Sequence, residues 1–157
     1  MVLAGVEYMH PIYREASHWS QLLPEGVRGN PERMSQDELL KEAWALVHPH
    51  YQGIRQQAME LYQQLHGTGR TTDRVSEAVT AASHGRIDTL FVPVGVHRWG
   101  HFDEAKNSLV MHPEAQPGAD DLLDLAALTT LSNGGRVFVV QPEQIPNGAQ
   151  VAAIYRY

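Results

Sequence analysis

The sequence predicts an α/β protein, a three-layer α-β-α sandwich with a mixed sheet of about four strands, preceded by a long kinked amphipathic helix. Three observations predict this class: a continuously apolar run at residues 89–94, a capped helical pattern that starts after residue 121, and two further apolar stretches at 137–140 and 151–155. Short strands that alternate with helices are typical of a sheet that buries both faces under helices.

The length and the composition exclude several classes of protein and of functional site. The 157 residues suffice for one well-cored domain. No apolar run could cross a bilayer and the first residues lack a secretory signal, so we expect a cytoplasmic protein with no membrane partner. Because the chain has no cysteine, it cannot form disulfides, thiolate zinc sites or cysteine nucleophiles. The net charge of −6 repels phosphate backbones and disfavours direct nucleic-acid binding.

The first 34 residues predict an irregular segment. Residues 3–6 are apolar and compatible with a strand, but no adjacent segment offers it a partner. We interpret residues 1–34 as an irregular segment with a leftover strand from a preceding domain, and residues 35–157 as the α/β domain with its leading helix. An edge strand added to the main sheet is the alternative. Helix breakers crowd this segment: Pro11, Pro24, Gly26, Gly29, Asn30 and Pro31.

A long amphipathic helix begins at Ser35, because serine at a helix start with Glu38 three residues later forms a capping box. Apolar residues then recur at spacings of three and four up to Gly67. Pro49 predicts a kink or a break, and the unbroken apolar phase favours one bent helix of about thirty residues over two stacked helices. The apolar seam consists of Leu40, Trp44, Val47, Tyr51, Ile54, Ala58, Leu61 and Leu65.

The remaining elements follow in order. A short helix over residues 75–82, capped by Thr72 or Asp73, leads into a central strand that must end at Pro93. Residues 95–120 read as a long connection with a weak extended piece at 108–111. The pair Asp120 and Asp121 places negative charge at the start of the next helix, which ends at residues 133–134.

The connection carries the densest group of reactive side chains. We select His97, Trp99, His101, Phe102 and Asp103 as candidate partner-binding residues, because exposed aromatic side chains beside charges are typical of interface anchors. Two alternatives stay open. The aromatic residues could fold back onto the core, or His97, His101, Asp103 and Glu104 could bind a divalent metal.

Motifs of common enzyme classes are missing from the sequence. No G-x-S-x-G predicts a nucleophile elbow, and neither a dinucleotide-binding nor a P-loop motif occurs. We therefore expect no enzyme, no catalytic residues, no cofactor and no metal.

Several motifs resemble the bacterial members of the archaeo-eukaryotic release factor family, relatives of the eukaryotic class-1 release factor and of Pelota. These are GRIDTLFV at 85–92, WGHFD at 99–103, DLLD at 121–124, NGGRV at 133–137 and AAIYRY at 152–157, with LAGVEY at 3–8 and PIYR at 11–14. The resemblance implies the tail of the middle domain followed by the third domain, which has the fold of the kink-turn-binding ribosomal proteins. The Gly-Gly-Gln tip expected of the middle domain does not occur here, where Gly134 and Gly135 precede Arg136.

The resemblance implies a non-catalytic protein-binding domain of a release-factor-like translation or ribosome-rescue protein, whose partner belongs to the translation machinery. An RNA-binding module of the kink-turn type is the alternative, and a small metal-dependent hydrolase that uses residues 97–104 is the weakest one. Since the seam over residues 40–65 must be buried against something, self-association through this helix is a further prediction.

Overall fold

The computed structural model describes residues 1–157 and divides into two compact units, Met1–Gln56 and Gln57–Tyr157. The helix α2 (Gln36–Leu65) contributes its first part to one unit and its last part to the other. The predicted domains, 1–34 and 35–157, stay a prediction. None of the helices combines the length and the apolar character that crossing a membrane requires.

The second unit is built on a four-stranded mixed sheet with the order β3-β9-β4-β8. The central strand β4 (Ile87–Pro93) runs parallel to the edge strand β8 (Arg136–Val140) and antiparallel to its other neighbour, β9 (Ala152–Tyr155). The fourth strand is the two-residue β3 (Thr71–Thr72), which pairs with β9. Strand β4 is buried over nearly its whole length and Pro93 is its last residue, which confirms the prediction from its continuous apolar run.

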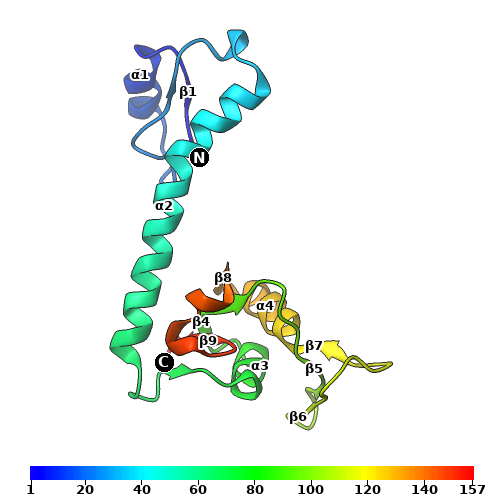
Figure 1. Ribbon diagram of the computed structural model, residues 1–157. Coiled ribbons are helices and arrows are strands. Elements are labelled where there is room, and N and C mark those ends of the chain that lie inside the picture. Colours follow the sequence, from blue (N-terminus) through cyan, green and yellow to red (C-terminus); the bar gives the residue numbers. More distant parts are fainter. The chain divides into compact units, whose positions relative to one another are not determined.

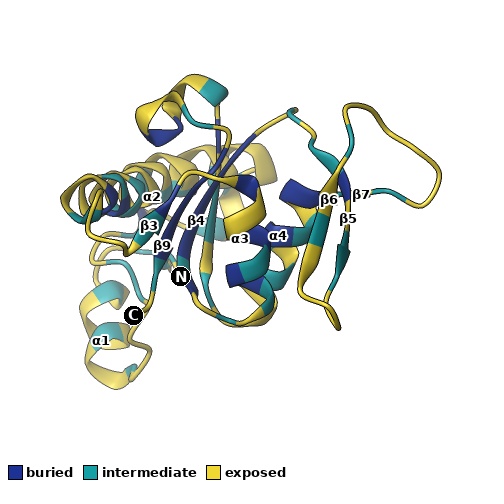
Figure 2. Cartoon of the chain, turned by 90° about the horizontal axis from the view of Figure 1, so that it is seen from below, coloured by how far each residue is buried: buried dark blue, intermediate teal, exposed yellow.

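Helices cover both faces of this sheet, as Figure 2 shows. On one face, α3 (Val75–Ser83) and α4 (Leu122–Ser132) bury a hydrophobic cluster that includes Val79, Leu90 and Leu123. On the other face, the end of α2 packs Ala58 and Tyr62 against Phe91 and Ile154, beside the short helices η2 (Pro142–Gln144) and η3 (Pro146–Gly148). The three-layer α/β architecture predicted from the sequence is therefore confirmed.

The segment between β4 and α4 is more regular than predicted. Instead of a connection with one weak extended piece, it forms a separate three-stranded antiparallel sheet of β5 (Trp99–Asp103), β6 (Ser108–Met111) and β7 (Asp120–Asp121). The extended piece at 108–111 was predicted correctly. Its partners were missed because an alternating five-residue strand that follows several polar residues resembles a loop in sequence.

The first unit contains a small parallel sheet (Figure 1). Strand β1 (Ala4–Gly5) pairs with β2 (Val27–Arg28), and α1 (Met9–Ala16) lies between them in sequence. The expectation that residues 3–6 lack a partner is wrong, because a parallel partner comes only after a crossover and not in the adjacent segment. The short helix η1 (Pro31–Arg33) then leads to α2.

Helix α2 begins with the predicted capping box. The Ser35 hydroxyl oxygen accepts a hydrogen bond from the Glu38 backbone N–H, and the Glu38 carboxylate accepts one from the Ser35 N–H at 2.9 Å. The helix continues through Pro49 for 30 residues, so the alternative of two stacked helices is wrong. Of its apolar seam, Leu40, Trp44, Tyr51 and Leu61 are exposed. Self-association through residues 40–65 stays a prediction.

Candidate functional site

The β5–β6–β7 sheet presents the candidate residues on two faces. Directly opposite residues of an antiparallel pair share a face, and successive residues alternate between faces. Phe102 lies opposite Leu109, and both pack against the core of the second unit. Trp99, His101 and Asp103 therefore belong to the other, outward face.

The inward face is held close to α4 by a glycine. A Cβ atom on the buried Gly100 would lie 2.6 Å from Leu122 Cδ1 and 2.5 Å from the Val110 carbonyl oxygen. No larger residue fits without a shift of β6 or α4. The sheet is thus fixed against the domain by one close approach and two apolar side chains, Phe102 and Leu109.

Aromatic and apolar groups gather on the outward face. The His97 ring stacks on Trp99, with ring centroids 5.7 Å apart and planes 22° apart. His101 is exposed and lies opposite Val110, a valine that is 55% exposed. An exposed apolar residue beside a half-buried tryptophan and two imidazoles is the composition expected of a protein interface.

Asp121 fixes the start of this face. One carboxylate oxygen accepts hydrogen bonds from the backbone N–H groups of Leu123 at 3.1 Å and Arg98 at 3.2 Å, and the other lies 2.5 Å from His97 Nδ1. It thereby caps α4 and orients the His97 ring over Trp99 at the same time. The prediction that this acidic pair serves the helix start is confirmed for Asp121, whereas its contact with His97 was missed.

Asp103 is engaged in the turn after β5. Its carboxylate forms an ion pair with Lys106 at 3.0 Å and accepts a hydrogen bond from the Lys106 backbone N–H. The Lys106 ammonium group holds the pKa of this carboxyl below its ordinary value. Through these contacts Asp103 stabilises the turn after β5. Of the predicted residues, His97, Trp99 and His101 remain accessible on the outward face.

The candidate metal ligands of residues 97–104 do not form a cluster. No three His, Asp or Glu side chains lie close enough together to hold a metal ion. His97 and Asp121 form a pair of the kind that orients a catalytic histidine, but no serine or threonine hydroxyl is hydrogen-bonded to that ring. The pair therefore positions an aromatic surface.

The comparison with solved structures identifies a related fold. The C-terminal domain of the peptide chain release factor from Methanosarcina mazei is similar, with a TM-score of 0.53 and 15% identity, over 80% of this chain and 97% of that one. Pelota from Archaeoglobus fulgidus matches with a TM-score of 0.47 and 14% identity. That match covers 99% of this chain, which spans 48% of the Pelota chain. No curated protein matches the sequence.

Structural similarity at such low sequence identity shows the fold alone. A family model assigns the chain to a family. It describes bacterial archaeo-eukaryotic release factor family 3 and matches residues 1–86. That range covers the first unit and the start of the second, up to the beginning of the GRIDTLFV motif, whereas most of the motifs that suggested the resemblance lie after it. The match extends over more than half of the sequence, and the chain belongs to bacterial archaeo-eukaryotic release factor family 3.

Proposed function

We propose that this chain is a non-catalytic protein-binding domain of a release-factor-like translation or ribosome-rescue protein, and that the outward face of the β5–β6–β7 sheet binds its partner. Membership of the release-factor family supports the role in translation. The single observation that supports the site is the stack of His97 on Trp99, held by Asp121 at the start of a core helix.

The face has the properties of a preorganised interface. Trp99 lies on a strand fixed against α4, so its side chain loses little further freedom when a partner covers it. His101 and Val110 extend the surface across β5 and β6. Lys106 already pairs with Asp103, so the one carboxylate on the outward face of β5 is neutralised and this face is suited to an uncharged or weakly charged partner surface.

A ribosome and translation-factor binding assay with the full chain tests this proposal. Trp99→Ala should weaken binding at least tenfold, since a central tryptophan commonly contributes about 2 kcal/mol or more to an interface. Leu128→Ala is the matched control, because Leu128 is a large, exposed residue on the outer side of α4. Equal losses in both variants, or no binding of the wild-type chain to ribosomes or purified translation factors, would contradict the proposal.

RNA binding is the second candidate, and one feature supports it. The Arg86 guanidinium lies 5.2 Å from the Tyr155 ring centroid and 5.8 Å from that of Tyr157, and no carboxylate pairs with it. Tyr157 is 73% exposed, so an arginine and an aromatic ring are both accessible at this end of the sheet. Arginine with a stacking ring is a common combination at single-stranded RNA sites.

Filter binding at low salt separates the two candidates. RNA binding that weakens steeply with salt and is lost in Arg86→Ala but retained in Trp99→Ala would place RNA first. Protein binding that is lost in Trp99→Ala and unchanged in Arg86→Ala would support the main proposal.

A further inference from the structure

Four arginines gather at one end of the four-stranded sheet, although the chain has a net charge of −6. Arg70 and Arg86 directly precede β3 and β4, and Arg136 is the first residue of β8. Arg156 follows β9, which runs antiparallel to β3 and β4, so its end meets the starts of the other strands. The Tyr155 N–H donates to the Arg70 carbonyl at 2.9 Å, and the Arg156 N–H donates to that of Arg86 at 2.8 Å. All four arginines are exposed, and we call them the basic end.

Carboxylates neutralise only part of this charge. Arg136 Nη2 donates to Asp88 at 2.8 Å, and burial by itself would raise the pKa of Asp88. Hydrogen bonds and the charges of Arg136 and Arg156 lower that pKa instead, so one carboxylate faces two guanidinium groups. Arg70 and Arg86 form no ion pair.

The other basic side chains of Gln57–Tyr157 are bonded to neighbours elsewhere in the unit. The positive potential of this unit is therefore greatest at the basic end, where an anionic ligand is attracted. The bonded pairs are Arg74 with Glu77, Arg98 with Gln150 and Lys106 with Asp103.

A hollow with polar walls adjoins the basic end. Its volume is about 400 Å³, and the Arg86 guanidinium lies over its Tyr155 wall, 5.2 Å from the ring centroid. The side chains of Ser76, Glu77 and Thr80 also line it. Hydroxyl and carboxylate groups can hydrogen-bond the edge of a base. Since sites for small molecules have volumes of about 300–1,000 Å³, the hollow can hold one unstacked base.

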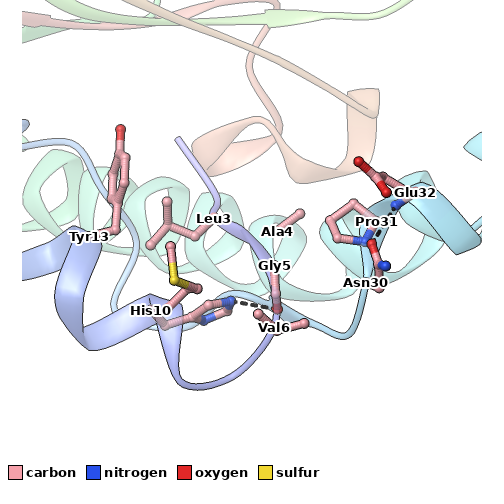
Figure 3. A pocket seen from close by; sticks show the side chains of 10 residues that line it. Leu3, Ala4, Gly5, Val6, His10, Tyr13, Asn30, Pro31 and Glu32 are labelled. Atoms are coloured by element: carbon pink, nitrogen blue, oxygen red, sulfur yellow. Dashed lines mark hydrogen bonds between the residues drawn. The ribbon is translucent and has the colours of Figure 1, made fainter.

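The hollow of about 510 Å³ along β1 in the first unit lacks this chemistry, as Figure 3 shows. Leu3 and Val6 are part of its apolar lining, and its polar side chains include His10, Asn30 and Glu32. Neither a lysine nor an arginine lines it. A phosphate there would meet the Glu32 carboxylate without a compensating guanidinium group, so the basic end is the better site for an anionic ligand.

We propose that the basic end binds single-stranded RNA, with phosphates on Arg70 and Arg86 and one base in the hollow beside Tyr155. A single strand offers a phosphate and an unpaired base together, whereas the bases of a duplex are stacked and paired. This inference rests on RNA binding, the second candidate function. It does not depend on protein binding by the Trp99 face.

Helix α4 separates the two surfaces. Its start is tied to the outward face of the β5–β6–β7 sheet by the contact of Asp121 with His97. Its end is tied to the basic end, because Arg156 Nη2 donates to the Asn133 carbonyl at 2.6 Å. The 11 residues of the helix span about 16 Å. RNA and a protein partner therefore do not compete for one surface.

Fluorescence anisotropy with the full chain and a labelled single-stranded RNA of mixed sequence tests the site. The RNA has about 20 nucleotides, more than the roughly 4–16 that one module covers. The wild type should bind it at low salt. Arg70→Gln and Arg86→Gln should each weaken binding several-fold and reduce the slope of log affinity against log salt by about 0.7, the value for one phosphate contact. Arg33→Gln removes the same charge from an exposed position of the first unit and should change neither.

Four results would overturn the proposal: no binding at low salt, equal losses in Arg33→Gln and Arg86→Gln, tighter binding of a duplex of the same length, or competition by polyglutamate as strong as that by unlabelled RNA. The last result would make an acidic polypeptide the occupant. Unchanged far-ultraviolet circular dichroism confirms that each variant is folded, and Arg70→Gln keeps the test decisive should Arg86→Gln unfold.

Trp99→Ala distinguishes this inference from the main proposal. The variant should bind the RNA with wild-type affinity, because Trp99 lies at the other end of α4. Loss of RNA binding in Trp99→Ala would contradict the separation of the two surfaces. A wild type that binds translation factors but no RNA contradicts this inference alone, and one that binds RNA but no protein contradicts the main proposal alone.

Discussion

The two units of the chain bury their hydrophobic residues to different degrees. In Gln57–Tyr157, a four-stranded sheet is covered on both faces, and Leu90 and Phe91 are inaccessible to solvent. In Met1–Gln56, only Val27 is buried, although the unit contains a long helix with a complete capping box. The difference shows that local interactions suffice to define helices and caps, whereas a stable tertiary structure requires two-sided burial.

Removal of a large aromatic side chain should give the largest difference in the free energy of unfolding between the two units. Phe91→Ala removes a ring stacked on Phe138 at 5.3 Å, and should reduce the free energy of unfolding by about 3–5 kcal/mol. Tyr51→Ala removes a ring that is 60% exposed and should change it by less than about 0.5 kcal/mol. Urea unfolding followed by circular dichroism measures both. A large loss in Tyr51→Ala would reveal burial in the first unit and break the comparison.

Replacing a glycine with alanine should lower the stability in the second unit and raise it in the first. A Cβ on Gly135 would lie 2.6 Å from Thr130 Cγ2 and 2.8 Å from the Ile87 carbonyl oxygen, so Gly135→Ala should cost about 1–3 kcal/mol. A Cβ on Gly53, within α2, would meet nothing within 4 Å. Gly53→Ala should therefore stabilise the helix by about 0.5–1 kcal/mol. Thermal melts check the signs, and a destabilised Gly53→Ala variant would contradict the open surroundings of α2.

Helix caps should be equally important in both units, because a cap depends on the local backbone. Asp121→Ala exposes the unpaired N–H groups at the start of α4, and Ser35→Ala does the same at the start of α2. The lost cap should cost about 1 kcal/mol at each helix, and Asp121→Ala should cost more in total because it also removes the contacts of Asp121 with Arg98 and His97. Hydrogen exchange of the first-turn amides locates each effect. A much smaller loss in Ser35→Ala would show that the first unit is frayed at this helix end.

The smallest effects concern acid stability. Burial alone would raise the pKa of Asp88, but hydrogen bonds from Arg136 at 2.8 Å and Thr89 at 2.7 Å hold it below its ordinary value of 3.8. A lowered pKa stabilises the folded state above the unfolded pKa, and this contribution is lost as the pH falls through the folded pKa. Asp88→Asn should therefore flatten the pH dependence of stability below about pH 4.

Glu38 gives the matching measurement in the first unit. Hydrogen bonds from the Ser35 backbone N–H and hydroxyl lower its pKa although the side chain is fully exposed. Carboxyl carbon resonances in an NMR titration should show both groups below their ordinary pKa. An ordinary value for Glu38 in the wild type, with Asp88 still lowered, would indicate that the first helical turn is not formed.

The sequence predicts those parts of the fold that carry a repeated or directional pattern. The Ser35 cap, the buried run of β4 and the helix after Asp121 are each specified by residues close in sequence. The two-residue strands β1, β2 and β3 are too short for any periodicity, and β1 finds its partner only across α1. In the candidate site, WGHFD was predicted to be part of a connection, whereas it forms β5, on which Trp99 and Phe102 face opposite ways. The contact between His97 and Asp121 joins residues 24 positions apart, which no local pattern reveals.

The segment that forms the β5–β6–β7 sheet is an insert between β4 and α4 of the main domain. The Val94 N–H still donates to the Val140 carbonyl of the main sheet, and the Leu122 N–H at the start of α4 donates to the Arg98 carbonyl at 2.7 Å. Its entry and exit are thus tied to the scaffold, and its interior contacts the core at Gly100, Phe102 and Leu109. An insert with so few anchoring positions can vary at its remaining residues without rebuilding the scaffold, which gives evolution a place to change the surface while folding is conserved.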